Sequence, residues 1–202
     1  MSGWERLAFS NTRSTTTNAN DTLSTGTFTP KKYLHVETYY SYADSGNDPK
    51  MSFNTDVSTS NYNYRRSIDN SATDAPTSGD GAISNNAAGG SNRFFERIDI
   101  VNILADEKQA LIRVYYAGEG ATDDPHWRWY ASKWADLTEQ ITKINIIMGS
   151  GSIDDGSCIT VWGTDDPIAT YPKLQDGSIY EEQDTGKIYI WKLSTNTWSE
   201  VT

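Results

Sequence analysis

Three pairs of adjacent aspartates come closest to metal-binding chemistry in this sequence. Carboxylate oxygens are hard ligands of the kind that Ca²⁺ prefers, and each pair falls in a predicted loop. None follows the spaced Asp-x-Asp-x-Asp-Gly calcium loop, and aspartate before glycine or proline is also ordinary turn chemistry. The pairs are therefore either calcium ligands or turn residues. They are Asp123, Asp124, Asp154, Asp155, Asp165 and Asp166.

The side chains that could act in covalent or acid–base catalysis do not form a known motif. His35 lies in a strand pattern and His126 follows a turn, and no Gly-x-Ser-x-Gly motif surrounds Ser157 or any other serine. The adjacent pair Glu181-Glu182 lies in a predicted strand, where neighbouring residues point to opposite faces and cannot flank one glycosidic bond. We therefore expect no enzymatic activity and no cofactor, and we interpret Cys158 as a small hydrophobic residue within a strand.

Tryptophan is the third residue type with functional chemistry. The chain contains 7 tryptophans and 12 tyrosines. An exposed indole ring can stack on the apolar face of a sugar, but aromatic rings also fill sandwich cores and subunit interfaces. We expect most of these rings in the core or at an interface. The candidates for an interface or a ligand site are Trp127, Trp129, Trp191 and Trp198.

Composition limits the classes of partner. Among the 202 residues, 27 acidic and 17 basic side chains give a formal net charge of −10, which argues against nucleic acid or an anionic membrane as a partner. The single cysteine excludes an internal disulfide. No apolar run approaches the roughly 18–20 residues that span a bilayer.

The elements that must position these residues are short strands. Apolar and polar residues alternate with the period of two that is typical of half-buried strands. The predicted strands cover residues 4–9, 33–40, 50–54, 62–68, 94–104, 110–116, 126–134, 141–148, 159–163, 179–180, 187–191 and 198–201. The pattern favours a two-layer antiparallel sandwich.

Several features interrupt this pattern. The apolar alternation slips within residues 94–104, which predicts a β-bulge. Gly156 and Gly163 are expected where a turn or a close approach needs glycine. The polar stretches 10–27 and 69–92 are predicted as surface loops or as arms that become ordered on a neighbouring subunit.

The carboxyl-terminal half resembles known viral proteins. The alternating segment 141–146 and the strand 156–163 (Gly-Ser-Cys-Ile-Thr-Val-Trp-Gly) resemble the closing hairpin of jelly-roll virion structural proteins from tailed phages and uncultured aquatic viruses. The Lys133-Trp134 pair and the predicted hairpin over residues 94–116 are similar to features of the same group. Residues 184–191 with Trp198 resemble a phage-type β-motif that is often appended to virion and tail proteins.

This resemblance covers roughly residues 93–202 and implies an all-β fold. It implies an antiparallel jelly-roll β-sandwich over residues 30–166. An N-terminal strand and polar arm would precede it over residues 1–29, and a small β-meander would follow over residues 167–202.

The resemblance also implies a non-enzymatic virion structural protein that forms or decorates the particle surface as a capsid-associated, neck or fibre component. We expect such a protein in the virion as a homotrimer, in contact with other virion proteins such as the major capsid or tail proteins. The alternative is a receptor- or glycan-binding module at a tail fibre or tail tip, with a host-surface glycan as its partner. A non-viral extracellular filament subunit is a third interpretation.

Overall fold

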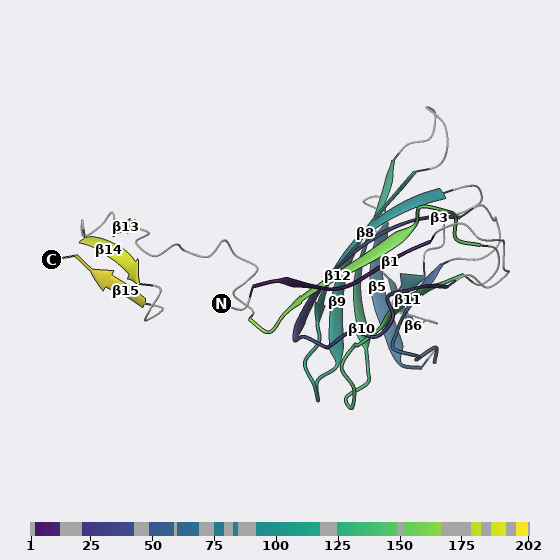
Figure 1. Ribbon diagram of the computed structural model, residues 1–202, viewed down its shortest axis with the longest axis horizontal. Helices are drawn as coiled ribbons and strands as arrows, with labels where there is room; N and C mark the ends of the chain where they lie inside the picture. Colours follow the sequence, from purple (N-terminus) through teal and green to yellow (C-terminus); the bar gives the residue numbers. More distant parts are fainter. Residues whose placement is uncertain are drawn as a thin grey trace. The chain divides into compact units, whose positions relative to one another are not determined.

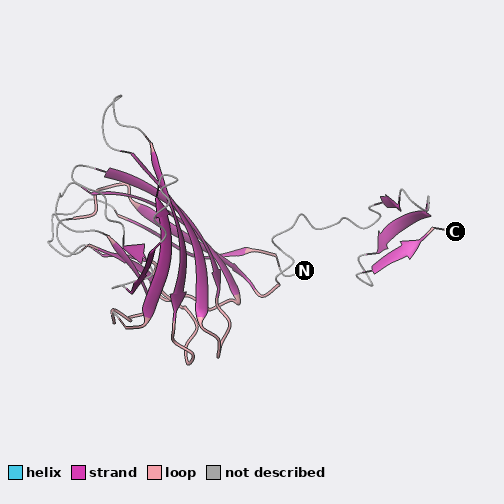
Figure 2. Ribbon diagram, turned by 180° about the vertical axis from the view of Figure 1, so that it is seen from behind, coloured by secondary structure: helices cyan, strands magenta, loops and turns pink. Residues whose placement is uncertain are grey.

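The computed structural model has two compact units, Met1–Asp166 and Pro167–Thr202, and describes the greater part of the first and the strands of the second. The described residues are 3–12, 22–42, 49–58, 60–68, 75–78, 83–84, 92–117, 125–148, 152–166, 179–182, 187–192 and 197–201. They form strands and connecting loops without any helix (Figure 2). Within this part of the chain there is consequently no helix with the length and hydropathy needed to cross a membrane.

The first unit contains two antiparallel sheets (Figure 1). The large sheet has eight strands in the order β1 (Glu5–Asn11), β12 (Cys158–Thr164), β3 (Tyr33–Tyr42), β8 (Asn92–Val101), β9 (Lys108–Ala117), β10 (His126–Trp134), β5 (Tyr62–Ile68) and β6 (Ala75–Ser78). The small sheet has four strands in the order β2 (Thr22–Ser24), β11 (Ile144–Ile147), β4 (Lys50–Phe53) and β7 (Ile83–Ser84).

The strand pairing is that of a jelly roll. When the consecutive pairs β5–β6 and β9–β10 are set aside, eight strands remain, and the first pairs with the last: β1 with β12. Inside that pair lie β2 with β11, β3 with β8 and β4 with β7, with the partners divided over the two sheets. Two Greek keys in two sheets define this architecture. The predicted antiparallel jelly-roll β-sandwich is therefore confirmed.

One buried cluster lies between the two sheets. Val36 and Ile98 contribute to it from the large sheet, while Met51 and Ile146 contribute from the small sheet. Alternation along each strand places these residues on the interior face and their neighbours on the outside. The strands β9 and β10 extend the same interior surface, where Trp134 is almost completely buried.

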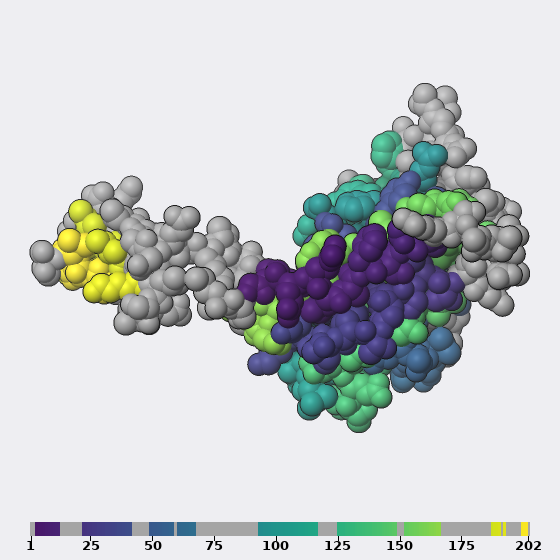
Figure 3. All heavy atoms as spheres, viewed as in Figure 1, coloured from purple at the N-terminus to yellow at the C-terminus, as the bar shows by residue number. Residues whose placement is uncertain are grey.

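The N-terminal segment is part of the sandwich, which corrects the boundary predicted at residue 30. β1 pairs along its length with β12, and β2 occupies an edge of the small sheet. Figure 3 shows β1, in purple, lying on the surface of the first unit beside residues from the 22–42 range. The side chain of Leu23, within the stretch predicted as a polar loop, is only 2% exposed. Residues 13–21 of the predicted arm lie outside the described residues.

The bulge predicted within residues 94–104 was wrong. β8 pairs with β3 and β9 in unbroken register from Arg93 to Val101. The apolar pattern slips because Glu96 and Asn102 are buried polar residues, whereas Val101 points outward and is exposed. The large sheet does contain an irregular register, but it lies in β1 between Arg6 and Ala8.

The expectations for two glycines are confirmed. Gly156 has a φ of 82°, in the left-handed region that favours glycine. A Cβ atom at Gly163 would lie 2.5 Å from Leu7 Cδ1 and 2.8 Å from Lys31 Cγ. Gly163 therefore permits the close approach of β1 and of the segment before β3 to β12.

Two side-chain amides hold the chain before β11 in place. Asn102 is fully buried; its Nδ2 donates to the carbonyl oxygens of Lys31 (2.9 Å) and Ile141 (3.1 Å), and its Oδ1 accepts from Ile141 N (2.6 Å). Asn54 has a φ of 55°, and its Oδ1 accepts from Thr142 N at 2.8 Å. These bonds satisfy backbone groups near the core, and they add to backbone hydrogen bonds such as that from Phe28 N to Thr142 O at 2.7 Å.

The second unit is a three-stranded antiparallel meander, as predicted. It consists of β13 (Ile179–Glu182), β14 (Lys187–Lys192) and β15 (Thr197–Glu200). β14 is the central strand, and Lys187 Nζ lies 3.2 Å from Glu200 Oε2 across the β14–β15 pair.

Candidate functional site

The outer face of the large sheet, which points away from the core, is the most distinctive surface of the described residues. Alternation along β3, β8, β9 and β10 sends every second side chain to this face. Large apolar side chains that would normally be buried are exposed here, including those of Leu111, Tyr115 and Trp129. The strand registers arrange the side chains of this face in rows that run across the strands.

The outer aromatic row contains one aromatic residue from each of four neighbouring strands. It runs through Tyr39, Phe95, Tyr115 and Trp127, which are direct cross-strand partners. The rings of Phe95 and Tyr115 are stacked with centroids 6.4 Å apart. Tyr39 is 40% exposed and Tyr115 is 45% exposed. The row therefore presents ring surface to the outside of the sandwich.

The next row, which we call the arginine row, lies beside the outer aromatic row and contains Glu37, Arg97, Arg113 and Trp129. Arg97 Nε lies 3.2 Å from Glu37 Oε1, and the Arg97 guanidinium lies 5.4 Å from the centroid of the Phe95 ring. The Arg113 guanidinium lies 4.9 Å from the centroid of the Trp129 ring. Trp129 is 48% exposed, so a cation and an indole are presented together.

A histidine and an aspartate form the third row. His35 Nδ1 is hydrogen-bonded to Asp99 Oδ1 at 2.7 Å, and His35 Nε2 lies 3.7 Å from Glu37 Oε1. The bond to Asp99 raises the pKa of His35, and the same bond lowers the pKa of Asp99. The imidazole packs near the rings of Trp162 and Trp4, with centroid distances of 5.8 and 6.3 Å.

On the opposite side of the same strands lies an inner aromatic row. Tyr40, Phe94, Tyr116 and His126 are cross-strand partners, with successive ring centroids 5.1, 5.5 and 4.9 Å apart and interplanar angles below 20°.

Beside the inner row the buried carboxylate of Glu96 accepts hydrogen bonds from the hydroxyls of Thr38 (2.9 Å) and Tyr40 (2.7 Å). The Arg128 guanidinium donates to Tyr116 Oη and lies 4.7 Å from that ring's centroid. These groups belong to the interior of the sandwich.

The structure brings together two of the four predicted tryptophans. Trp127 and Trp129 share the outer face of β10, and their ring centroids are 6.0 Å apart at a near-perpendicular angle. Trp191 and Trp198 are direct partners in the β14–β15 register, but their side chains lie outside what the structure describes. A role of these two residues at an interface stays a prediction.

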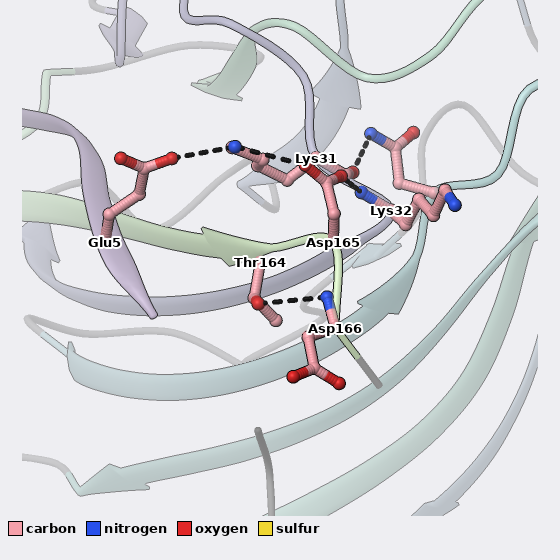
Figure 4. A network of polar contacts seen from close by, with 7 residues as sticks. Glu5, Lys31, Lys32, Thr164, Asp165 and Asp166 are labelled. Carbon is pink, nitrogen blue, oxygen red and sulfur yellow. Dashed lines mark hydrogen bonds and ion pairs between the residues drawn. The ribbon is translucent and has the colours of Figure 1, made fainter. Parts of the chain in front are cut away.

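The two aspartate pairs that the structure describes lie in separate loops. Asp165 accepts from Lys31 Nζ (3.1 Å) and from Lys32 N (3.1 Å), and Lys31 Nζ also contacts Glu5 Oε1 at 2.9 Å (Figure 4). These contacts lower the pKa of Asp165, with the hydrogen bond from Lys32 N as the largest cause. Asp166 N donates to Thr164 Oγ1 at 3.1 Å, which is turn chemistry.

Of the other two aspartate pairs, the structure describes only Asp154-Asp155. Asp154 holds its turn through its backbone, because its carbonyl accepts from Thr12 Oγ1 and Ser157 Oγ, each at 2.8 Å. Asp155 is exposed in the same turn. Asp123 and Asp124 lie outside the described residues. Among the described side chains, no group of three or more His, Cys, Asp or Glu residues is arranged to hold a metal ion. Calcium binding by these pairs stays a prediction.

The nucleophiles considered from the sequence occupy structural positions. Ser157 is buried, and its hydroxyl donates to the carbonyl of Asp154 while accepting from Ser41 N at 3.3 Å. Cys158 is a free cysteine on β12 and is half-buried. His35 lies on the outer face, whereas His126 belongs to the inner aromatic row.

Sequence reasoning missed most of the outer aromatic row. Tyr39, Phe95 and Tyr115 each stand next to a core aromatic residue, so the pattern shows doublets such as Phe94-Phe95 and Tyr115-Tyr116. Such doublets hide which ring points inward. The signal that could have revealed the row is the register of the predicted β8–β9 hairpin, because it places Phe95 opposite Tyr115.

Comparison of the chain with known protein families, with characterised proteins and with solved structures finds no match. The function therefore has to be argued from the fold and from the chemistry of the outer face.

Proposed function

We propose that this chain is a non-enzymatic structural protein of a virus particle, where it forms or decorates the particle surface. The observation that carries the proposal is the nested strand pairing from β1–β12 to β4–β7. Eight-stranded jelly rolls of this kind build viral capsids, and they also occur in lectins. Because a fold alone does not fix a function, the proposal draws equally on the resemblance of residues 93–202 to phage and aquatic-virus proteins.

Symmetric association is supported by the second unit. Among its side chains that the structure describes, none is buried, and Ile188 and Val201 are 42% and 48% exposed. Because the described side chains of these three strands cover little apolar surface, the unit is close to the lower limit of independent stability. Contact between equivalent units in a homotrimer would cover these side chains, so we propose that this unit contributes to assembly.

The location in a particle is tested on virus particles purified from the source of the gene. Mass spectrometry should detect the chain at a fixed ratio to the major capsid protein, and antibodies against the recombinant chain should label intact particles in electron micrographs. A chain that is abundant in infected cells but missing from purified particles would refute the proposal.

The oligomeric state is tested by light scattering on the purified full-length chain. We expect three times the 22.5 kDa mass of one chain, and we expect Ile188→Asn to shift the population toward monomers. Leu137→Asn, at an exposed loop position of the first unit, is the matched control. A monomer at all concentrations would contradict assembly through this unit.

A further inference from the structure

The outer aromatic row and Trp129 place ring surface where folding does not require it. Among these five rings, those of Tyr39, Tyr115 and Trp129 are the most exposed, each by at least 40%, although aromatic side chains are largely buried on average. Contiguous exposed apolar surface on a soluble domain is typical of a binding site. Because neighbouring strands lie about 4.8 Å apart, the four rings of the row span about 14 Å.

The charges around these rings differ from those of the whole chain. Arg97 and Arg113 are direct cross-strand partners, and like charges in that position repel each other. Arg93 points to the same face on the other side of the aromatic row. Glu37 is the only acidic residue that the registers of β3, β8, β9 and β10 place in the row of Arg93, the outer aromatic row and the arginine row. Asp99 lies in the neighbouring row, where it is hydrogen-bonded to His35. The rows that carry the rings and the arginines are therefore cationic, although the chain carries a net charge of −10.

Exposed aromatic rings beside arginines indicate which kind of ligand the outer face can bind. Flat aromatic rings suit the apolar faces of sugar rings, and guanidinium groups form paired hydrogen bonds with carboxylate or sulfate. A neutral glycan would offer no anionic group to these arginines, of which Arg97 is paired with Glu37 and Arg113 packs on Trp129. We propose that the outer face binds an anionic polysaccharide, with sugar rings on Tyr115 and Trp129 and acidic groups on Arg97 and Arg113. The site does not depend on the proposed location in a virus particle.

The strand arrangement suits an extended polymer. Each of β3, β8, β9 and β10 supplies one ring at a regular interval, so consecutive sugar units can meet consecutive strands. The packing of Arg97 on Phe95 and of Arg113 on Trp129 holds each cation beside a ring. A ligand that uses both groups pairs its acidic substituents with the arginines, and its binding weakens as salt rises.

The inference is tested by binding of the full-length chain to three polymers: alginate, which carries carboxylates, dextran sulfate, which carries sulfates, and neutral dextran. We expect binding to at least one anionic polymer and none to dextran. Arg113→Gln and Trp129→Ala should each weaken that binding by about tenfold or more, since the first removes a charged hydrogen bond and the second removes the ring on which a sugar stacks. The preferred anionic polymer identifies which acidic group is recognised.

Matched controls separate this site from general charge attraction. Lys32→Gln removes one positive charge from an exposed loop position before β3, and Leu137→Ala truncates an exposed apolar side chain in a loop. Both should bind like the unchanged chain. Equal weakening by Lys32→Gln and Arg113→Gln, or absence of binding to both anionic polymers, would overturn the inference.

A second copy of the chain is the competing occupant of the face. If Trp129→Ala abolished self-association in the absence of polysaccharide, the face would be a subunit contact and the inference would be wrong. If antibodies label the particles but neither anionic polymer binds, the polysaccharide inference is wrong and the proposed function in a virus particle is unaffected. If an anionic polymer binds but the chain is missing from particles, the polysaccharide inference is supported and the proposed function in a virus particle is wrong.

Discussion

Consecutive residues on four neighbouring strands build two aromatic rows on opposite faces of one sheet. The inner aromatic row contains Tyr40, Phe94, Tyr116 and His126, and the outer aromatic row contains Tyr39, Phe95, Tyr115 and Trp127. Tyr40 and Phe94 are at most 1% exposed, whereas Tyr39 and Tyr115 are at least 40% exposed. The same residue types therefore serve packing on one face and remain available for contacts on the other.

The polar groups differ between the two faces in the same way. Next to the inner row, the carboxylate of Glu96 has hydroxyl donors inside the core and is fully buried. Next to the outer row, Glu37 and Arg97 form an exposed ion pair. Buried polar groups must be satisfied for the fold to form, whereas exposed ion pairs contribute little to stability. The comparison predicts that changes on the inner face alter folding and changes on the outer face alter binding.

The largest expected difference is between Phe94 and Phe95. Phe94→Ala should lower the free energy of unfolding by about 3–5 kcal/mol, because it leaves a cavity between the stacked rings of Tyr40 and Tyr116. Phe95→Ala should cost about 1 kcal/mol or less, since the contacts that it removes, with the Tyr115 ring and the Arg97 guanidinium, lie on the outer face. Denaturant unfolding of both variants measures the two values. Equal losses would refute the division between the faces.

The next difference is between Glu96 and Glu37. Glu96→Ala should destabilise the chain by about 1–3 kcal/mol, because the buried hydroxyls of Thr38 and Tyr40 lose their acceptor. Glu37→Ala should change stability by about 1 kcal/mol or less, because its ion pair is exposed. The measurement is again denaturant unfolding at neutral pH. A larger loss for Glu37→Ala than for Glu96→Ala would contradict the comparison.

A pH dependence tests the outer face by itself. Because the pKa of His35 is raised in the folded chain, the protonated imidazole stabilises the fold. This stabilisation is fully present below pH 6.5, the pKa of an unperturbed histidine, and is lost as pH rises through the folded pKa. Because the pKa of Asp99 is lowered in the folded chain, the ionised carboxylate stabilises the fold. This stabilisation is fully present above pH 3.8, the pKa of an unperturbed aspartate, and is lost as pH falls through the folded pKa. The stability difference between the unchanged chain and Asp99→Asn should therefore be larger at about pH 5 than at about pH 9.

The control for this pH experiment is Asp155→Asn, at an exposed position in a turn. Its effect on stability should not follow the same profile. A difference for Asp99→Asn that grows as the pH rises from 5 to 9 would mean that the His35–Asp99 pair does not stabilise the folded chain.

The smallest expected effect concerns Tyr115. Tyr115→Ser should change the free energy of unfolding by roughly 0.5 kcal/mol, because nearly half of the side chain is exposed. The same substitution should weaken binding of an anionic polysaccharide. Thermal unfolding and polymer binding of one preparation measure both effects. A strongly lowered melting temperature would assign this ring to the core rather than to the binding face.

The sequence predicted the long strands and the hairpin over residues 94–116, because alternation and turn residues are local signals. It also placed Trp127 and Trp129 on one face, since they are two positions apart on a strand. The short strands β2, β6 and β7 were missed, because two to four residues within a polar stretch carry no period. The false bulge arose from Glu96 and Asn102, whose burial depends on partners far away in the chain.

The outer aromatic row could not be predicted from single strands. Each of its rings stands beside an inner ring in the sequence, and only the pairing of four strands brings Tyr39 and Trp127 into the same row. The facing arginines Arg97 and Arg113 likewise become visible only in the register of β8 with β9. Non-local pairing is therefore the information that the local pattern lacks.

The two added hairpins of the large sheet have a consequence for how this protein can vary. The nested eight-strand framework is complete without β9 and β10, yet these two strands carry Arg113, Tyr115, Trp127 and Trp129. These two strands therefore carry half of the proposed binding face, and the pairing of the other eight strands does not depend on them. Sequence changes in β9 and β10 would therefore alter ligand binding while the strand pairing of the jelly roll is retained.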